Sequence, residues 1–309
     1  MLKAKSVIFY TILFAGIIRI TSLYQQNSSI PHLLWPFPAS YSFGDIDIVI
    51  DDSCHFSFNI NNNGPEKDIP AVFEAYKGYM FSGAECLEKN NSNQGNFIGK
   101  SNNVLNFEIK DINKVQMDLD VDESYSLRVE DGNFVVTAET YVGALRGLET
   151  FSQLISKKQN GTFSISSTPI QISDAPRFPH RGLMLDTSRH FISKTNILKI
   201  LDGMMFSKLN VFHWHLADSD SFPFFFPSHP NLTKFGSFLS KQVYSKQDIQ
   251  EIIDYAYVRG IRIIPELDSP AHVRSWSQAP EVANLINCTT DGPFSNRTLG
   301  TLSDKPTNF

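Results

Sequence analysis

Acidic, imidazole and guanidinium side chains follow three short apolar runs in the second half of the chain. The runs cover residues 182–185, 210–216 and 261–265. The polar residues that come soon after them are Asp186, Arg189, Asp218, Glu266, Asp268 and His272. Carboxyl and imidazole groups transfer protons in general acid–base catalysis, and a guanidinium binds paired hydroxyls or a carboxylate. This combination is typical of an enzyme.

Asp218 and His272 follow different runs and form a candidate supporting pair. A carboxylate that orients an imidazole, which in turn tunes a carboxylic acid, is a familiar way to place a proton donor. Glu266 and Asp268 are the only nearby acids for that third place. Arg189 has two interpretations: it binds a substrate, or it forms an internal salt bridge with Asp218, Asp268 or the aspartate three residues before it.

His213 and His215 form a second candidate group. On a strand their rings point to the same side, and together with Asp268 or His272 they could ligate zinc. The alternative is a pair of core histidines satisfied by polar neighbours. We favour the second interpretation, because the pair lies inside an apolar run with Trp214 between the two rings. We therefore expect no metal and no cofactor.

The apolar runs predict parallel strands that are buried on both faces. Helices are expected between them, one starting at Ser193 and one starting at a capping box formed by Ser245 and Asp248. The buried stripe predicted for the first helix is Ile197, Leu201, Met204 and Met205; that of the second is Ile249, Ile252, Ile253 and Ala256. Reactive groups at the carboxyl ends of such strands are typical of a (β/α)8 TIM barrel. A barrel needs about 250 residues, so we expect residues 177–309 to hold only its first three strands.

The preceding part of the chain predicts an α+β N-terminal domain over residues 32–172. Alternating polar and apolar residues indicate strands at 46–50, 55–60 and 104–109. Segments 124–129 and 134–137 flank an Asp-Gly turn signal and predict a hairpin. Helical spacing predicts an amphipathic helix over 141–157. We find no catalytic constellation in this domain, which favours a structural or docking role.

The first residues are typical of a secreted protein. Two lysines precede an apolar run at 7–18, which predicts a signal peptide over residues 1–22; a retained membrane anchor is the alternative. Six N-x-Ser/Thr triplets are candidate glycosylation sites, at Asn27, Asn90, Asn160, Asn231, Asn287 and Asn296. Cys54 and Cys86 are disulfide candidates, and Cys288 is left over. The net charge of −5 lacks any basic block, which argues against a nucleic-acid partner.

Several long motifs occur in the order found in one enzyme family. Residues 178–190 read FPHRGLMLDTSRH, residues 208–218 read KLNVFHWHLAD, and residues 259–272 read RGIRIIPELDSPAH. With GALRGLETFSQL at 143–154 and LWPFP at 34–38, the chain resembles the N-terminal portion of the β-N-acetylhexosaminidases of glycoside hydrolase family 20. The likeness is to the animal, lysosomal type of subunit.

This resemblance implies a reaction and roles for three residues. These enzymes remove terminal β-linked N-acetylglucosamine or N-acetylgalactosamine from glycans with retention, and the acetamide of the substrate is the nucleophile. By position, Arg189 resembles the arginine that binds the hydroxyls of the sugar. Asp218 and His272 resemble the pair that supports the catalytic glutamate. A lysosomal or secreted homodimer or heterodimer is the form expected of the full-length protein, without a stable membrane anchor.

The chain also departs from the pattern of the family. In relatives a His-x-Gly-Gly-Asp-Glu motif carries the aspartate that orients the acetamide and the glutamate that acts as acid and base. No Gly-Gly-Asp-Glu occurs in these 309 residues. Ser219, Ala271 and the run of phenylalanines at 224–226 also differ from what is usual. We therefore expect the 309 residues alone to be inactive; the alternative is a non-catalytic glycoprotein that binds a glycan or a partner.

Overall fold

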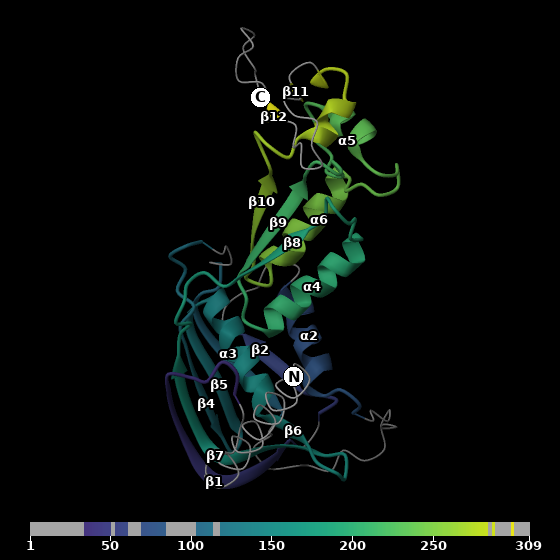
Figure 1. Ribbon diagram of the computed structural model, residues 1–309. Coiled ribbons are helices and arrows are strands. Elements are labelled where there is room, and N and C mark those ends of the chain that lie inside the picture. Colours follow the sequence, from purple (N-terminus) through teal and green to yellow (C-terminus); the bar gives the residue numbers. More distant parts are fainter. Residues whose placement is uncertain are drawn as a thin grey trace, which may run out of the picture.

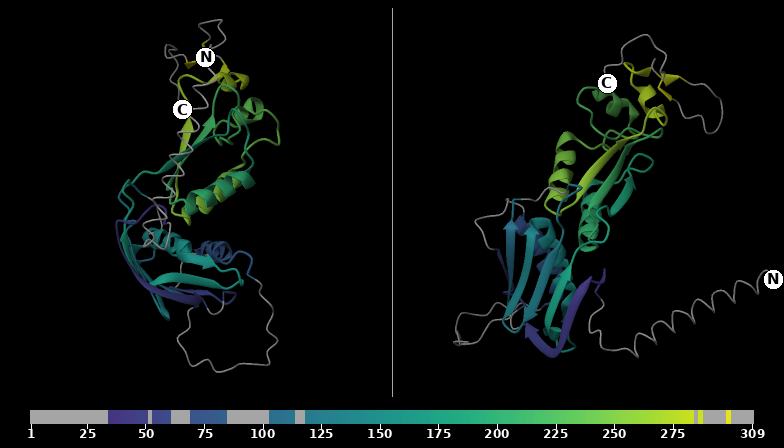
Figure 2. Two further views of the ribbon diagram at one scale, coloured as in Figure 1. Left: turned by 60° about the horizontal axis from the view of Figure 1, so that its bottom comes forward. Right: turned by 90° about the vertical axis from the view of Figure 1, so that its left-hand side faces the viewer.

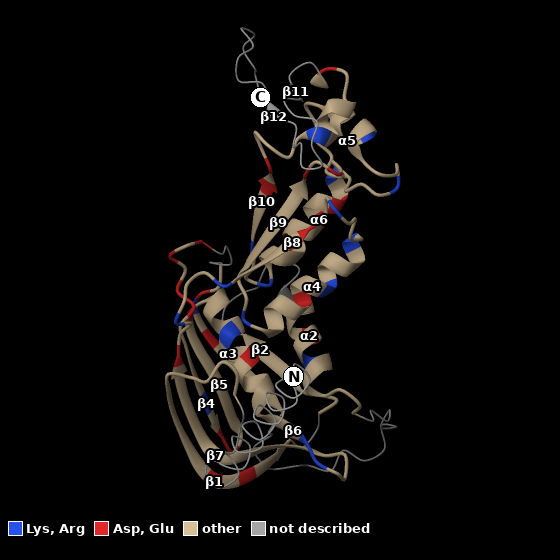
Figure 3. Ribbon diagram, in the orientation of Figure 1, with Lys and Arg blue, Asp and Glu red and all other residues tan. Residues whose placement is uncertain are grey.

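The computed structural model describes residues 34–50, 53–60, 69–84, 103–113, 118–283, 286–287 and 298–299. Figure 1 shows an elongated molecule with a large sheet at one end and a smaller parallel sheet toward the other. Figure 2 shows the same two layers from other directions. In Figure 3, lysine and arginine are interspersed with aspartate and glutamate over the described elements.

The first layer is a mixed seven-stranded sheet packed on two helices. Its strands are β1 (Ser40–Ile50), β2 (Ser57–Ile60), β3 (Val104–Asp111), β4 (Tyr125–Glu130), β5 (Asn133–Thr140), β6 (Ile155–Lys157) and β7 (Phe163–Asp174). The order is β1-β7-β4-β5-β3-β2, and β6 pairs with β7. The helices are α2 (Ile69–Met80) and α3 (Tyr141–Leu154). The three predicted strands and the predicted hairpin are confirmed, whereas β7 and α2 were not predicted.

Helix α3 is buried along nearly its whole length. The side chain of Thr140 caps its first turn by accepting a hydrogen bond from the Gly143 amide. A Cβ atom at Gly143 would lie 2.5 Å from the Ser124 carbonyl oxygen, so only glycine lets the helix approach the sheet this closely. The helix ends at Leu154 instead of residue 157, because Ile155 adopts extended geometry and begins β6.

The second layer is a parallel sheet in the order β10-β9-β8. Its strands are β8 (Gly182–Asp186), β9 (Val211–Ala217) and β10 (Arg262–Leu267), and the helices α4 (Lys194–Phe206) and α6 (Lys246–Tyr257) connect them. The short helices α5 (Pro230–Gly236) and η1 (Arg274–Gln278) follow strand ends, and β11 (Ile286–Asn287) pairs with β12 (Thr298–Leu299). The three predicted parallel strands are thus confirmed; their membership of an eight-stranded barrel remains a prediction.

The expectation that all three strands are buried on both faces is wrong for two of them. Strand β9 is buried along nearly its whole length, but Met184 of β8 and Ile264 of β10 are 55% and 36% exposed. Both residues are register partners of His213, which is itself 40% exposed, so the three side chains lie on one face that the described residues leave partly open. Among the described residues, β8 and β10 are also the edge strands of this sheet.

The helix signals of this layer are mostly confirmed. Ser245 and Asp248 form the predicted capping box at the start of α6, and the four residues of the predicted stripe on α4 are buried. Ser193 occupies the N-cap position of α4, but its side chain makes no capping hydrogen bond. Ile253 of α6, which was expected in the core, is 41% exposed.

The two layers are joined through one buried carboxylate. Glu123 is 7% exposed and accepts hydrogen bonds from Arg146 at 2.7 Å, from Arg181 at 2.5 and 3.0 Å, and from Asn210 at 3.1 Å. Arg146 also donates to the carbonyl oxygen of Gly260 at 3.1 Å. Although burial raises the pKa of Glu123, the two arginines hold it below its ordinary value. We call these five residues the joint; they lie at the amino ends of β8, β9 and β10.

A second buried polar group borders the joint. The ammonium of Lys208 donates to the hydroxyl of Thr150 at 2.7 Å, and Gln153 donates to the carboxylate of Glu149 at 2.8 Å. Burial raises the pKa of Glu149 to about 7 and lowers that of Lys208 to about 8. The contact between the layers therefore contains groups that titrate near neutral pH.

Candidate active site

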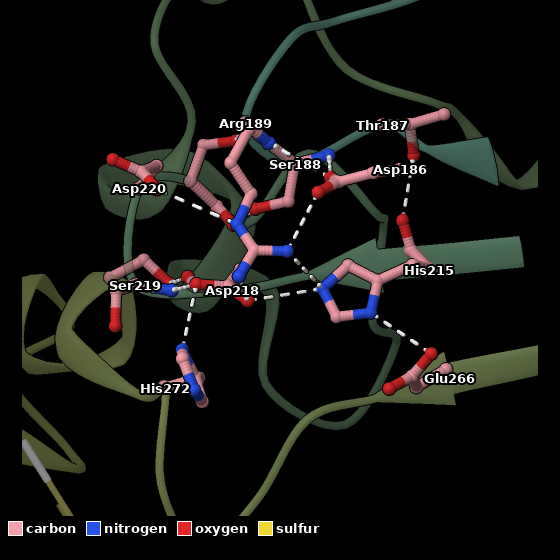
Figure 4. A network of polar contacts seen from close by, with 12 residues as sticks. Asp186, Thr187, Ser188, Arg189, His215, Asp218, Ser219, Asp220, Glu266 and His272 are labelled. Atoms are coloured by element: carbon pink, nitrogen blue, oxygen red, sulfur yellow. Dashed lines mark hydrogen bonds and ion pairs between the residues drawn. The ribbon is translucent and has the colours of Figure 1, made fainter. Parts of the chain in front are cut away.

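The side chains of the candidate site come from the carboxyl ends of the three parallel strands, opposite the joint. Asp186 ends β8, Asp218 directly follows β9, and Glu266 lies near the end of β10. His272 belongs to the segment after β10. Figure 4 shows Asp186 and Asp218 beside the guanidinium of Arg189, His272 directed at Asp218, and Glu266 directed at His215. Parallel strands bring their carboxyl ends to one edge of a sheet, so residues far apart in the sequence meet here.

Arg189 is held between two carboxylates. Its Nη1 donates to Asp186 Oδ2 at 2.7 Å, and its Nη2 lies 2.6 Å from Asp218 Oδ2. Asp186 also accepts hydrogen bonds from the backbone amides of Ser188 and Arg189, which fix the turn after the strand. Burial raises the pKa of Asp186, but its hydrogen bonds with Arg189 outweigh this and lower it. The internal salt bridge considered from the sequence therefore exists, yet the arginine side chain remains 40% exposed.

Asp218 is the most buried member, with a side chain that is 1% exposed. Its Oδ1 accepts from the Ser219 amide at 2.5 Å and lies 3.3 Å from Nδ1 of His272. The structure thus brings the predicted pair Asp218 and His272 into contact. His272 has a positive φ of 59°, a conformation that non-glycine residues adopt rarely and that is common at functional sites.

His213 and His215 both point toward Glu266. Nε2 of His213 lies 2.5 Å, and Nδ1 of His215 lies 3.0 Å, from the same Glu266 oxygen. The intervening Trp214 points the other way into the core and donates its indole N–H to Thr187. The pKa of Glu266 is lowered, chiefly by its hydrogen bond with His215. His215 is a buried, satisfied histidine as favoured from the sequence, but His213 is 40% exposed and is not in the core.

Two groups of side chains have ligand atoms close enough to hold a cation. They are His215, Glu266 and Asp268, and Asp218, Asp268 and His272, with ligand atoms within 4.8 Å of one another. Arg189 already supplies positive charge to Asp218, and each nitrogen of His215 already faces a carboxylate oxygen. Contacts among protein groups therefore account for the arrangement, and we take it as an ion-pair network and not as a metal site.

Sequence reasoning missed two features of this network. Nε2 of His215 lies 3.1 Å from Asp218 Oδ2, a contact between residues three apart at the end of a strand. Ser188 and Ser221 exchange hydrogen bonds, each hydroxyl donating to the other residue's carbonyl oxygen at 2.7 Å. The spacing His-x-x-Asp was visible in the sequence, but it does not by itself indicate that the chain turns back after Ala217.

The predicted modification sites lie partly within the described residues. Cys54 is disulfide-bonded, whereas Cys86 and Cys288 lie outside the described residues. Asn160 lies in an exposed turn in which its side chain oxygen accepts from the amide and hydroxyl of Thr162. Asn231 donates to Glu281 at 3.1 Å. The side chains at positions 27, 90, 287 and 296, and the predicted signal peptide, are outside the described residues.

Comparisons with known proteins cover both layers. The glycosyl hydrolase family 20 catalytic domain matches residues 178–302, and a domain described as beta-acetyl hexosaminidase like matches residues 34–154. Beta-hexosaminidase subunit alpha of Mus musculus is 41% identical over 74% of this chain and 43% of its own length. Beta-hexosaminidase 1 of Arabidopsis thaliana is 36% identical over 84% of this chain and 49% of its own length.

A solved structure agrees with these matches. The chitobiase of Flavobacterium johnsoniae superposes with a TM-score of 0.71 and 30% identity, over 86% of this chain and 39% of that one. The chain therefore spans less than half the length of these relatives. The matches to both layers place the fold of this chain among the glycoside hydrolases. Within that class, the chain belongs to glycosyl hydrolase family 20.

Proposed function

We propose that this chain supplies the sugar-binding and acid-supporting side of an enzyme that hydrolyses terminal N-acetyl-β-D-hexosamine residues of glycoconjugates. The substrates are glycans that end in β-linked N-acetylglucosamine or N-acetylgalactosamine. The reaction proceeds with retention, and the acetamide of the substrate serves as the nucleophile. The names of the curated relatives, β-hexosaminidases from mouse and Arabidopsis, support this assignment.

The observation that carries the proposal is the placement of Asp218 between Arg189 and His272. Asp218 is buried, while Arg189 and His272 are 40% and 33% exposed at the carboxyl ends of the strands. A guanidinium has five N–H donors in a rigid fork. The two carboxylates that hold Arg189 fix this fork and leave donors for a pair of sugar hydroxyls.

His272 is suited to act on a third group. Its Nδ1 faces the Asp218 carboxylate at 3.3 Å, so this carboxylate orients the imidazole, and an oriented imidazole can tune the acid that protonates the leaving group. Glu266 is a poor candidate for that acid, because its hydrogen bond with His215 lowers its pKa and keeps it ionised. The family motif Gly-Gly-Asp-Glu, whose glutamate acts as the acid and base, does not occur in these 309 residues.

The experiment compares two polypeptides with a chromogenic β-N-acetylglucosaminide. The 309 residues alone should turn over the substrate no faster than buffer. The same residues fused to the remaining part of the mouse relative, with its His-x-Gly-Gly-Asp-Glu segment, should be active. In the active protein, Asp218→Asn should lower kcat/KM by about 100-fold or more.

Asp220→Asn is the matched control. The side chain of Asp220 is 46% exposed, and its Oδ2 lies 3.8 Å from Nε of Arg189. This substitution should change kcat/KM less than about tenfold, since an exposed ion pair contributes little. Equal losses for the two substitutions would contradict the role given to Asp218. Activity of the 309 residues alone that Asp218→Asn abolishes would contradict the need for the absent acid.

The remaining proposals concern the form of the protein. We infer a lysosomal or secreted glycoprotein with a disulfide between Cys54 and Cys86, domains at 32–172 and 177–309, and a dimeric full-length form. The disulfide bond of Cys54 and the exposed turn at Asn160 support an oxidising, glycosylating route. No helix among the described residues has the length and apolar character needed to cross a membrane.

A further inference from the structure

His215 makes contacts that the proposed reaction does not use. It lies on β9 with a side chain that is 5% exposed. Its Nε2 is 3.1 Å from Asp218 Oδ2, and its Nδ1 is 3.0 Å from Glu266 Oε2 (Figure 4). The imidazole therefore bridges two acidic residues that belong to different strand ends.

The chemistry of these neighbours determines the protonation of the ring. An ionised carboxylate only accepts hydrogen bonds, so a ring nitrogen facing one must carry a proton. Because both nitrogens of His215 face carboxylates, both are donors and the ring is an imidazolium. Charge-assisted hydrogen bonds of this kind are about twice as strong as neutral ones.

A neutral form of His215 fits the distances less well. In that form Nδ1 would donate to Glu266, and Nε2 would accept from Nη1 of Arg189, which is 3.4 Å away. The Asp218 oxygen is closer to the same nitrogen, at 3.1 Å, and a lone pair directed at it would be repelled. Burial lowers the pKa of His215, but the hydrogen bonds with Glu266 and Asp218 outweigh this and raise it.

The ring is also fixed in space. The carbonyl oxygen of His215 accepts hydrogen bonds from the amide and the hydroxyl of Thr187, at 3.1 and 3.2 Å. Trp214 donates to the same hydroxyl at 2.9 Å, so the strand on both sides of the ring is held. The charged groups around the ring are Asp186 from β8, Arg189 from the turn after it, Asp218, Glu266 and Asp268.

The two oxygens of Asp218 have separate partners. Oδ2 faces Arg189 and His215, whereas Oδ1 accepts from the Ser219 amide and faces His272. Arg189 is 40% exposed and is the residue that a sugar would engage. If it were the only partner of Oδ2, binding of a sugar would loosen the carboxylate. His215 is buried away from the substrate and holds Oδ2 whether or not Arg189 is occupied.

We propose that His215 is a positioning residue, present as an imidazolium, that keeps Asp218 oriented with Oδ1 toward His272. Glu266 is the second anchor of this ring, so β10 is coupled to the pair that supports the acid. The importance of this orientation for catalysis rests on the proposed function; the charge of His215 and its effect on Asp218 do not.

Nuclear magnetic resonance of ¹⁵N-histidine in the full 309-residue chain tests the charge. An ordinary histidine, with a pKa of about 6.5, is mostly neutral at pH 7. The ring assigned to His215, by its loss in His215→Gln, should show both nitrogens protonated at pH 7. In Glu266→Gln the pKa of this ring should fall by at least one unit. A His215 ring with one unprotonated nitrogen at pH 7 overturns the proposal.

The positioning role has its own readout in the Nδ1 proton of His272. A proton held against Asp218 Oδ1 gives a downfield resonance, which should be present in the parent and absent in Asp218→Asn. It should also be lost in His215→Gln but kept in the matched control His213→Gln, because His213 contacts Glu266 and not Asp218. A signal that survives in His215→Gln overturns the positioning role.

Neither measurement depends on turnover. If His215→Gln does not fold, the ring is assigned as the one that responds to Glu266→Gln and is retained in His213→Gln, because His213 and His215 are the two rings among the described residues that contact Glu266. His215→Asn then replaces the glutamine variant in the second measurement. A neutral ring would remove this inference and leave the proposed glycosidase intact. A charged His215 ring in a protein that hydrolyses no hexosaminide would contradict the proposed glycosidase and leave the charge of His215 established.

Discussion

The joint and the candidate site use the same chemistry at opposite ends of the parallel strands. In each, a buried carboxylate is held by arginine: Glu123 by Arg146 and Arg181, and Asp218 by Arg189. The arginines of the joint are 1% and 15% exposed, whereas Arg189 is 40% exposed. In the joint the arginines also donate to backbone carbonyl oxygens of the second layer, at Gly260 and Lys208. The difference teaches that a functional ion pair is recognised by the donors it leaves accessible, and not by the pair itself.

The largest effect on stability should come from the joint. Arg146→Met leaves the buried Glu123 carboxylate and the Gly260 carbonyl oxygen without one of their donors. Removing one partner of a buried pair costs about 3 to 5 kcal/mol. Urea unfolding should show a loss of this size, with the exposed Arg128→Met as control. A loss below about 1 kcal/mol would mean that Arg181 and Asn210 suffice for Glu123.

The buried polar group that borders the joint should make stability depend on pH. The pKa of Glu149 is about 7 in the folded protein, above its unfolded value of about 4.3, so the folded state binds more protons between these limits. The contribution of Glu149 to the free energy of unfolding should therefore be greatest below about pH 4.3 and fall by up to about 3 kcal/mol as the pH rises to 7. Lys208, with a pKa of about 8, titrates above this window.

Glu149→Gln removes the titrating group while keeping its shape. The decrease in unfolding free energy between pH 4.5 and 7 should shrink by the amount that Glu149 contributes. Glu139→Gln, at an exposed position, should keep the decrease of the parent. A Glu149→Gln protein whose stability falls with pH as steeply as that of the parent would assign the effect to another group.

At the site, the loss of the arginine should cost less. Arg189→Met leaves Asp218 in contact with the Ser219 amide, His215 and His272, so the carboxylate stays satisfied. We expect a loss of about 1.5 to 3 kcal/mol in urea unfolding, the range for one hydrogen bond to a charged group. A loss as large as that for Arg146→Met would show that the accessible arginine is as structural as the buried one.

The smallest losses of stability are expected from two serines at helix starts. Ser245 caps α6 with a side-chain hydrogen bond, whereas Ser193 occupies the same position on α4 without one. Ser245→Ala should cost about 1 kcal/mol. Ser193→Ala should cost less than about 0.5 kcal/mol, because no hydrogen bond is lost. Equal costs would show that the N-cap position matters more than the bond.

The sequence predicted the positions of helices and strands better than it predicted the burial of their side chains. Periodicity and caps located β9, α4 and α6, since these follow from neighbouring residues. It did not indicate that β8 and β10 are edge strands, because burial of an edge depends on what packs beside it. Strand β7 was missed although it pairs with β1, β4 and β6.

The same limit separates the two ion-pair networks. Asp218 and His272 could be paired from the sequence, because each follows a strand that the pattern identifies. Glu123 could not be paired with Arg146, because α3 packs against a distant segment, nor with Arg181 or Asn210, because the docking of one layer on the other brings them together. Likewise, strand alternation placed His213 and His215 on one side, but only the turn after Ala217 brings His215 to Asp218.

Helix α3 has a consequence for how the protein folds. Its residues pack on β4 and β5, and its hydroxyl and guanidinium groups at Tyr141 and Arg146 bond the carbonyl oxygens of Val258 and Gly260. A helix with partners on both sides belongs to two cores at once. Losing either layer would expose one of its faces, so the two layers should unfold in a single cooperative transition, and neither should be an autonomous folding unit.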